Sequence, residues 1–333
     1  MLKVADFLSQ WHNESPLIEV QTSGSTGTPK RMMVEKRRME ASARITCRFL
    51  GLKEGDTALL CMPLDYIAGK MVVVRTLVSR LRLIAVEPSS HPLQGLTSAP
   101  DFAAMVPLQV YHSLQVPEEA NLLRNIRHLI IGGGAIDAAL EAQLQSFPNA
   151  VWSTYGMTET LSHVALRRIS GPDASLWYSP LEGVDISLND DGCLTIDAPA
   201  VCPQRLTTND IAELHTDGRR FRILGRKDNI ICSGGLKIQA EEVENLLRPR
   251  LSCQFMVTKR HDPRLGEAVT LLFVGSRSLA GSIDEVCRNT LPRHWVPRYY
   301  LATDHLPTTA TGKPARAEAE RMAREKDSST LTI

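Results

Sequence analysis

The chain has 333 residues, 43% of them hydrophobic, and a formal net charge of +1 at pH 7. This length is typical of about two domains, and the hydrophobic content is sufficient for ordinary globular cores. The near-zero charge gives no overall field that would attract nucleic acid or an anionic membrane, so neither is expected as a partner.

The first chemically distinctive segment is rich in hydroxyl groups and glycine. Gly24 and Gly27 lack a Cβ, so the backbone there could approach phosphate oxygens closely, and Lys30 adds a positive charge. The spacing does not match a Walker motif. We predict a phosphate-binding loop, and the alternative is a flexible polar surface turn. The residues expected to contact phosphate are Thr22, Ser23, Gly24, Ser25, Thr26, Gly27 and Lys30.

Short apolar runs then alternate with patterns of helical period. Such alternation predicts an α/β fold with a mainly parallel sheet and crossover helices. Buried strands are expected at residues 57–61, 82–86, 104–106 and 128–131, and helices at about 35–50, 69–81, 117–124 and 137–146.

The pattern changes near residue 176 to short alternating segments joined by turn residues. Asp-Gly between such segments is a strong hairpin signal. The segments are 184–188, 193–197, 212–216 and 219–224. A small β-rich subdomain is therefore expected at about 176–227.

The rest of the chain has its own mixture of patterns. Helices are expected at 239–247 and 283–289, and strands at 253–258 and 269–274. This mixture predicts a small α+β C-terminal domain. We therefore expect two domains, residues 1–227 and 228–333.

Six further motifs follow the segment that is rich in hydroxyl groups and glycine. They are Gly132–Ala135, Tyr155–Thr160, Asp210, Gly225–Asp228, Ser233–Ile238 and Pro307–Pro314. In this order, the seven blocks resemble those of the acyl-adenylate-forming enzymes, which include acyl- and aryl-CoA ligases, luciferases and peptide-synthetase adenylation domains. The resemblance extends over nearly the whole chain. It implies ATP and CoA as substrates, Mg²⁺ as cofactor, and a mobile C-terminal cap over the active site.

The resemblance also implies roles for residues around the nucleotide. Those expected beside adenine are Gly133, Gly134, Ala135 and Tyr155, and the neighbouring Gly156 and Met157 are expected to bind the nucleotide. Thr158 would donate a hydrogen bond to the α-phosphate. Glu159 would bind Mg²⁺, because magnesium prefers hard oxygen ligands. The alternative for residues Tyr155–Thr160 is a turn at the end of a strand with a buried tyrosine.

Asp210 would accept hydrogen bonds from the ribose hydroxyls, and Arg226 would contact ribose or phosphate or else form a surface ion pair. The family more often has glycine before this aspartate. Asn209 stands here instead, and asparagine tolerates a left-handed backbone better than most residues. Lys313 matches the family's catalytic lysine, which would bridge the carboxylate and the α-phosphate. Otherwise it is an ordinary exposed lysine.

Asp228 matches the hinge about which the family's cap rotates after adenylation, so that one site performs two reactions in sequence. Residues expected to face the active site after this rotation are Ser233, Gly234, Gly235 and Lys237. Their glycines would leave a channel for the pantetheine arm of CoA.

The segment 63–75 lies where the family lines its acid pocket. Tyr66 and Gly69 would form a flat apolar wall, and the cations Lys70 and Arg75 would attract a second carboxylate. This combination most resembles the o-succinylbenzoate–CoA ligases of menaquinone biosynthesis. His163 could also touch the acid. The alternatives are ordinary helix-surface charges for the two cations and a core or surface position for the histidine.

One departure from the family is the absence of a leading subdomain before the phosphate loop. The chain is either a compact variant or a fragment. We expect the compact variant, in which more of one sheet is open to solvent or to the partner subunit of a homodimer. Seven irregularly spaced cysteines and the lack of a long apolar run favour a cytoplasmic protein. Two other functions stay open. One is another acyl-CoA ligase or a carrier-protein-loading enzyme, and the other is an inactive nucleotide-binding module.

Overall fold

The computed structural model describes residues 3–21, 31–309, 314–325 and 331–332. The chain forms two compact units. The first comprises Met1–Ser187, Thr195–Leu206 and Leu214–Arg222, and the second comprises Leu188–Leu194, Thr207–Glu213 and Ile223–Ile333. Within the described residues, no helix is both long and apolar enough to cross a membrane. All seven cysteines belong to the described part and are free thiols.

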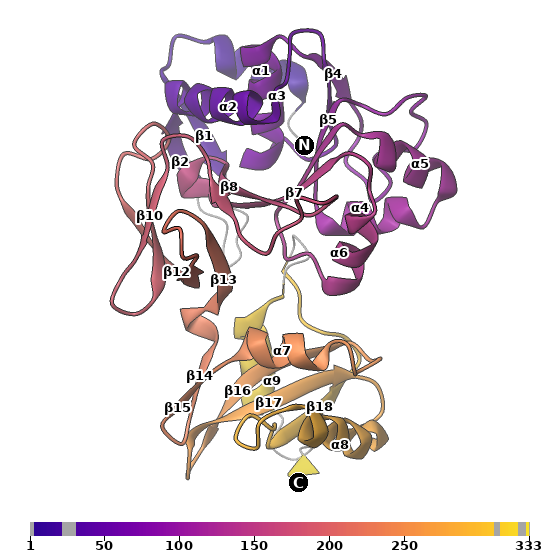
Figure 1. Ribbon diagram of the computed structural model, residues 1–333, viewed down its shortest axis with the longest axis vertical. Coiled ribbons are helices and arrows are strands. Elements are labelled where there is room, and N and C mark those ends of the chain that lie inside the picture. Colours follow the sequence, from indigo (N-terminus) through magenta and orange to yellow (C-terminus); the bar gives the residue numbers. More distant parts are fainter. Residues whose placement is uncertain (1–2, 22–30, 310–313, 326–330, 333) are drawn as a thin grey trace. The chain divides into compact units, whose positions relative to one another are not determined.

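A seven-stranded sheet in the order β4-β3-β5-β6-β7-β8-β9 forms the centre of the first unit (Figure 1). Its strands are β3 (Thr57–Leu60), β4 (Arg82–Ala85), β5 (Phe102–Met105), β6 (His128–Ile131), β7 (Ala150–Gly156), β8 (His163–Arg168) and β9 (Ser179–Pro180). The pairs from β4 to β7 are parallel, and β8 and β9 are antiparallel. The expected α/β fold is confirmed.

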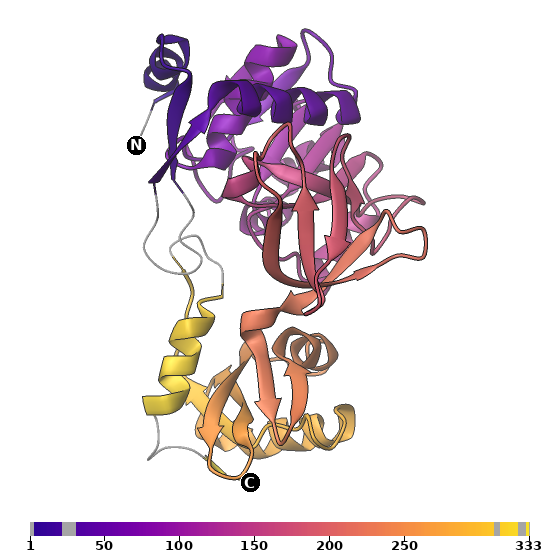
Figure 2. The same cartoon turned by 90° about the vertical axis from the view of Figure 1, so that its left-hand side faces the viewer.

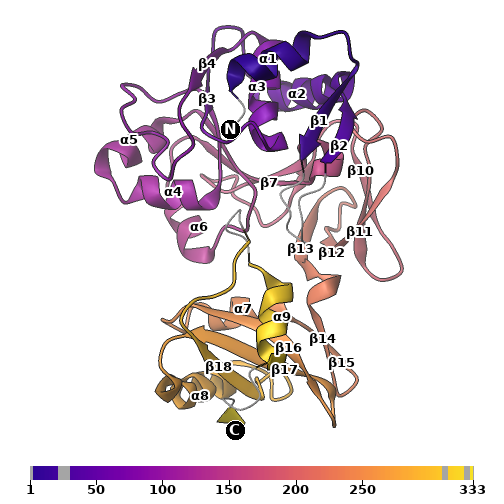
Figure 3. The ribbon, with the colours of Figure 1, turned by 180° about the vertical axis from the view of Figure 1, so that it is seen from behind.

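Helices cover both faces of this sheet. They are α2 (Lys36–Leu50), α3 (Ile67–Ser79), α4 (Pro107–Leu114), α5 (Pro117–Asn125) and α6 (Ala138–Gln145). Side chains of α4, α5 and α6 join Leu59, Ala103 and Leu129 of the strands in one core cluster. Figures 1 and 3 show these three helices gathered on one side of the sheet, with α2 and α3 side by side on the other. Helix α4 was not expected from the sequence.

Three short elements precede α2. Helix α1 (Val4–His12) buries Phe7 and Trp11, and β1 (Leu17–Gln21) pairs antiparallel with β2 (Arg31–Glu35). Gln21 also forms a parallel bridge with Tyr66, so the end of β1 lies beside the start of α3. Residues 22–30 join the two strands and lie outside the described residues.

A four-stranded sheet in the order β10-β11-β12-β13 follows. Its strands are β10 (Asp185–Leu188), β11 (Cys193–Asp197), β12 (Leu206–Leu214) and β13 (Phe221–Arg226). The two predicted hairpins account for these strands, but β12 begins six residues earlier than the expected 212.

A six-stranded sheet forms the centre of the second unit, in the order β15-β14-β17-β18-β19 with β16 beside β17. Its strands are β14 (Ile230–Ser233), β15 (Leu236–Gln239), β16 (Phe255–Asp262), β17 (Gly266–Val274), β18 (Tyr299–Thr303) and β19 (Leu331–Thr332). The helices are α7 (Ala240–Leu247), α8 (Ala280–Thr290) and α9 (Arg316–Glu325). Figure 2 shows α9 on one face of this sheet and α7 and α8 on the other, in agreement with the two core clusters.

Candidate active site

The predicted site residues of the first unit follow the carboxyl ends of parallel strands. Tyr66 to Lys70 come after β3, Gly133 to Ala135 after β6, and Gly156 to Glu159 at the end of β7. Because the strands are parallel and paired in the order β3-β5-β6-β7, these loops share one edge of the sheet. This edge is where open α/β sheets bind their ligands.

The loop after β6 is glycine-rich for two physical reasons. A Cβ on Gly132 would lie 2.3 Å from the hydroxyl oxygen of Thr154 on β7, so the loop runs closely across the neighbouring strand. Gly133 has φ +81°, a conformation that favours glycine. Gly134 and Ala135 are exposed. The exposed part of the loop therefore carries almost no side-chain volume. The packing of Gly132 against Thr154 was not predicted from the sequence.

The end of β7 approaches β8 unusually closely. A Cβ on Gly156 would lie 2.3 Å from the carbonyl oxygen of Ser162 and 2.5 Å from Cα of His163. The strand register shifts between Tyr155 and Gly156. Tyr155 is only half-buried and makes an edge-on contact with Phe221 at 5.2 Å between ring centroids. Only a residue without a side chain fits at Gly156.

A 3₁₀ turn over Thr158–Thr160 follows Met157. Thr160, to which we assigned no role from sequence, is buried, and its hydroxyl donates to Ser162 O at 2.7 Å and accepts from Met157 N at 3.0 Å. Leu161 then adopts φ +64°, which is uncommon for a residue other than glycine. These contacts fix the turn, with Thr158 half-buried and Glu159 exposed.

The exposed carboxylate of Glu159 fits a role in holding Mg²⁺. Magnesium usually keeps several waters and binds one or two carboxylates together with substrate phosphates. No group of three or more acidic, histidine or cysteine side chains able to hold a metal occurs among the described residues. A single exposed carboxylate is compatible with a magnesium ion that is bound mainly through substrate phosphates.

Arg75 is the most deeply buried cation of the site, with 2% of its surface exposed. Its Nη2 donates to the Ser162 hydroxyl at 2.6 Å, and its Nε has no hydrogen-bond partner. Among the described residues it forms no ion pair with a carboxylate. Burial lowers the pKa of Arg75 to about 10. The alternative that Arg75 is a helix-surface charge is wrong.

His163 is buried next to this arginine. Its Nε2 lies 3.0 Å from the Thr46 hydroxyl, and its Nδ1 lies 3.4 Å from that of Ser162. Burial, and secondly the charge of Arg75, hold the pKa of His163 well below its ordinary value. The imidazole is therefore neutral at pH 7, and a surface position is excluded.

The low pKa of His163 predicts that acid destabilises the protein. The unfolded chain binds a proton near pH 6.5, and the folded protein does so only at lower pH. Stability therefore falls as pH decreases below about 6.5, with a slope of up to about 1.4 kcal/mol per pH unit from this group. Urea unfolding at pH 5 to 7 should show a shallower pH dependence for His163→Gln. Equal slopes for both proteins would contradict this assignment.

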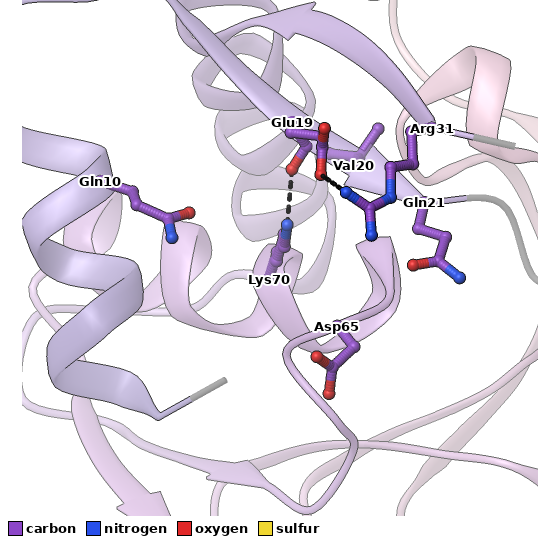
Figure 4. Close-up of a pocket in the computed structure, with 7 residues that line it drawn as sticks. All are labelled: Gln10, Glu19, Val20, Gln21, Arg31, Asp65 and Lys70. Carbon is purple, nitrogen blue, oxygen red and sulfur yellow. Dashed lines mark hydrogen bonds and ion pairs between the residues drawn. The ribbon is translucent and has the colours of Figure 1, made fainter. Parts of the chain in front are cut away.

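Lys70 is also buried but lies in a different environment. Its Nζ donates to the backbone carbonyl of Glu19 at 2.6 Å, and burial lowers its pKa. It lines a cavity of about 180 Å³ with Gln10, Glu19, Val20, Gln21, Arg31 and Asp65 (Figure 4). A helix turns about 100° per residue, so Lys70 and Arg75 project in directions that differ by about 140°. The structure does not bring the two predicted cations together.

The first turn of α3 packs directly on the loop after β3. A Cβ on Gly69 would lie 2.4 Å from the carbonyl oxygen of Pro63, so this position requires glycine. Tyr66 precedes the helix and bridges to Gln21. Gly69 therefore sets the approach of α3 to the loop.

Three predicted residues of the second unit form one cluster. Arg226 on β13 donates from Nη1 to Asp210 Oδ1 at 3.1 Å and from Nη2 to Asp228 Oδ2 at 3.1 Å. Asn209 lies within β12 and is not among the residues with positive φ. The left-handed backbone that we considered for Asn209 is therefore absent, because the residue continues an extended strand.

The predicted CoA-facing residues belong to a tight hairpin. Ser233 pairs with Leu236, and the two glycines between them have φ +57° and +83°. Two-residue turns with positive φ at both positions match the twist of a hairpin. Lys237 is exposed on β15, and Ser233 is buried. The predicted phosphate-loop residues Thr22 to Lys30 and the predicted catalytic residue Lys313 lie outside the described residues.

The chain belongs to the AMP-binding enzyme family, whose model matches residues 7–193. It is 25% identical to the 2-succinylbenzoate–CoA ligase of Listeria innocua, in a match that covers 93% of this chain and 71% of that protein. A crystal structure of an acyl-CoA synthetase (AMP-forming)/AMP-acid ligase II-like protein from Dyadobacter fermentans is 32% identical, with a TM-score of 0.65 and coverage of 94% and 92%.

A further solved structure has the same fold. It is the o-succinylbenzoate CoA synthetase of Bacillus subtilis in complex with the acyl-adenylate intermediate OSB-AMP, at 21% identity and a TM-score of 0.76. The match covers 95% of this chain and 70% of that one. The architecture described above is therefore that of an AMP-forming ligase.

Proposed function

We propose that the protein is an ATP-dependent, AMP-forming acid–CoA ligase whose acid is 2-succinylbenzoate. In the first half-reaction the carboxylate attacks the α-phosphorus of ATP, and pyrophosphate leaves. In the second, the CoA sulfur attacks the acyl carbonyl, and AMP leaves. Relatives that carry the name 2-succinylbenzoate–CoA ligase and match most of the chain support this proposal. The product would serve menaquinone biosynthesis.

The residues of the nucleotide site fit these substrates. Thr22 to Lys30 would hold the phosphates, the exposed Gly133 to Ala135 would lie beside adenine, and Tyr155 would contact the base. Asp210 would accept from the ribose hydroxyls and Thr158 would donate to the α-phosphate. Magnesium held at Glu159 would neutralise phosphate charge. Lys313 would bridge carboxylate and α-phosphate.

The single observation that supports this choice of acid is the burial of the Arg75 guanidinium. A guanidinium that is desolvated and whose hydrogen bond, within the described part of the chain, is to a hydroxyl offers a strong site for a ligand carboxylate, because charge-assisted pairs strengthen in a dry environment. Lys70 is less suited, since the carboxylates of Glu19 and Asp65 already share its cavity. We therefore assign the second carboxylate of the acid to Arg75 rather than to Lys70.

We also propose that residues 228–333 rotate as a cap about Asp228 between the two half-reactions. The exposed 3₁₀ turn Lys227–Asn229, which joins β13 to β14, supports this position for the hinge. After the rotation, Ser233, Gly234, Gly235 and Lys237 would face the acyl-adenylate.

Acid-dependent exchange of pyrophosphate into ATP tests the proposal. We expect 2-succinylbenzoate to support exchange at least about tenfold better than benzoate, from about 1.5–3 kcal/mol for a hydrogen bond to a charged group. Adding CoA should then give the thioester. Equal activity with benzoate or fatty acids would contradict the choice of acid, and no exchange with any acid would indicate an inactive nucleotide-binding module.

A further inference from the structure

The side chain of Asn209 contacts the proposed hinge residue. Its Nδ2 lies 3.2 Å from Oδ2 and 3.4 Å from Oδ1 of Asp228. Arg226 donates to the same carboxylate and also to Asp210, which follows Asn209 in β12. Donors from two neighbouring strands, β12 and β13, therefore hold the carboxylate of Asp228.

The backbone does not explain why asparagine stands at this position. Asn209 is an exposed residue inside β12, and its φ is not positive. An extended strand accepts many residue types, and asparagine is among those depleted in strands. The feature that distinguishes Asn209 is the amide group that reaches Asp228.

The two residues that precede Asp228 have partners of their own. Lys227 pairs with Asp191 at 2.6 Å, and the backbone carbonyl of Arg226 accepts from Gln239 Nε2 at 3.0 Å. These contacts restrain the chain before Asp228 and leave the dihedral angles of Asp228 itself free to change. A large change in these angles would move its carboxylate away from Asn209.

We propose that Asn209 is a positioning residue that tethers Asp228 and thereby biases the rotation of the C-terminal domain between the two half-reactions. The proposal rests on the proposed function, in which Asp228 is the hinge. The contact is exposed, so its interaction free energy is small. A small difference is sufficient, because it changes the ratio of two conformations of similar free energy several-fold.

Three substitutions at one position separate the amide from the size of the side chain. Asn209→Leu removes the donor but keeps the branching of the side chain, Asn209→Gln keeps an amide, and Asn209→Asp adds a charge that repels Asp228. Asn121→Leu is the matched control, because Asn121 is an exposed asparagine on α5 in the first unit. Thermal unfolding would confirm that each variant is folded.

The first measurement is amide hydrogen exchange of residues 226–232 in the substrate-free protein. We expect exchange about two- to fivefold faster in Asn209→Leu, which corresponds to the range for exposed polar contacts. Asn209→Asp should exchange faster still, with an excess that salt reduces. Asn209→Gln and Asn121→Leu should match the unmodified protein. Unchanged exchange in Asn209→Leu would overturn the tether.

The second measurement compares the two half-reactions, as pyrophosphate exchange and as thioester formation from supplied acyl-adenylate. The ratio of their rates should change by about two- to fivefold in Asn209→Leu and return in Asn209→Gln. An unchanged ratio would overturn the proposal that Asn209 influences the balance between the two half-reactions. Hydrogen exchange needs no substrate, so it tests the tether even if the unmodified protein does not act on 2-succinylbenzoate. Absence of activity in the unmodified protein would contradict only the proposed function.

Discussion

Replacing Gly156 with alanine is expected to reduce adenylate formation by about 100-fold or more, because a misplacement of reacting groups by about 1 Å can cost this much. The new Cβ would meet the backbone of Ser162 and His163 at 2.3 to 2.9 Å, and backbone cannot rotate away as a side chain does. Strand β8 must therefore move away from β7. That movement displaces Ser162, the hydrogen-bond partner of Arg75.

The same substitution should destabilise the fold by about 1–3 kcal/mol, the usual range for overpacking. Gly281→Ala is a matched control, because its Cβ would have no atom within 4 Å on the exposed start of α8. Alanine there should stabilise the protein by about 0.5–1 kcal/mol and leave activity unchanged. Pyrophosphate exchange and urea unfolding measure both effects. Full activity in Gly156→Ala would show that the β7–β8 contact does not position the site.

Strands β3, β5 and β6 of the central sheet could be predicted because they are buried on both faces, whereas β7, β8 and β9 were not predicted. Residues 57–61 and 128–131 are short continuous apolar runs between helical patterns, and such runs are typical of parallel strands. The two hairpins had clear turn residues. Elements α1, β1 and β2 were not predicted, because each is short and a short element gives a weak periodic signal.

The hydrogen-bond partners of the site residues could not be predicted from the sequence. Arg75 and Ser162 are 87 positions apart, and no local pattern indicates their contact. The burial of Arg75 did have a signal, since α3 is apolar on nearly all sides, and such helices are buried. For Asn209 only the backbone conformation was considered from the sequence. Its contact with Asp228 could not be predicted, because it depends on the pairing of β12 with β13.

Replacing Arg75 with methionine is expected to remove the preference for the dicarboxylate without destabilising the protein. Loss of a charged hydrogen bond should lower kcat/KM for 2-succinylbenzoate by about 10- to 150-fold, from about 1.5–3 kcal/mol. Activity with benzoate should change little, because benzoate has no second carboxylate to pair. Pyrophosphate exchange with the two acids measures this difference.

The stability of Arg75→Met separates a binding role from a structural one. A buried charge without a counter-ion destabilises the folded state, so a methionine of similar volume should leave stability unchanged or raise it by up to about 2 kcal/mol. Arg167 is the matched control: it is also buried, but it forms two bonds to Glu141 at 2.6 and 2.8 Å. Arg167→Met should therefore destabilise the protein by about 2–3 kcal/mol, since it leaves Glu141 unpaired. If Arg75→Met also lost stability, and lost activity equally with both acids, then Arg75 would be a structural residue. The second carboxylate would then need another partner, and Lys70 would be the next candidate among the described residues.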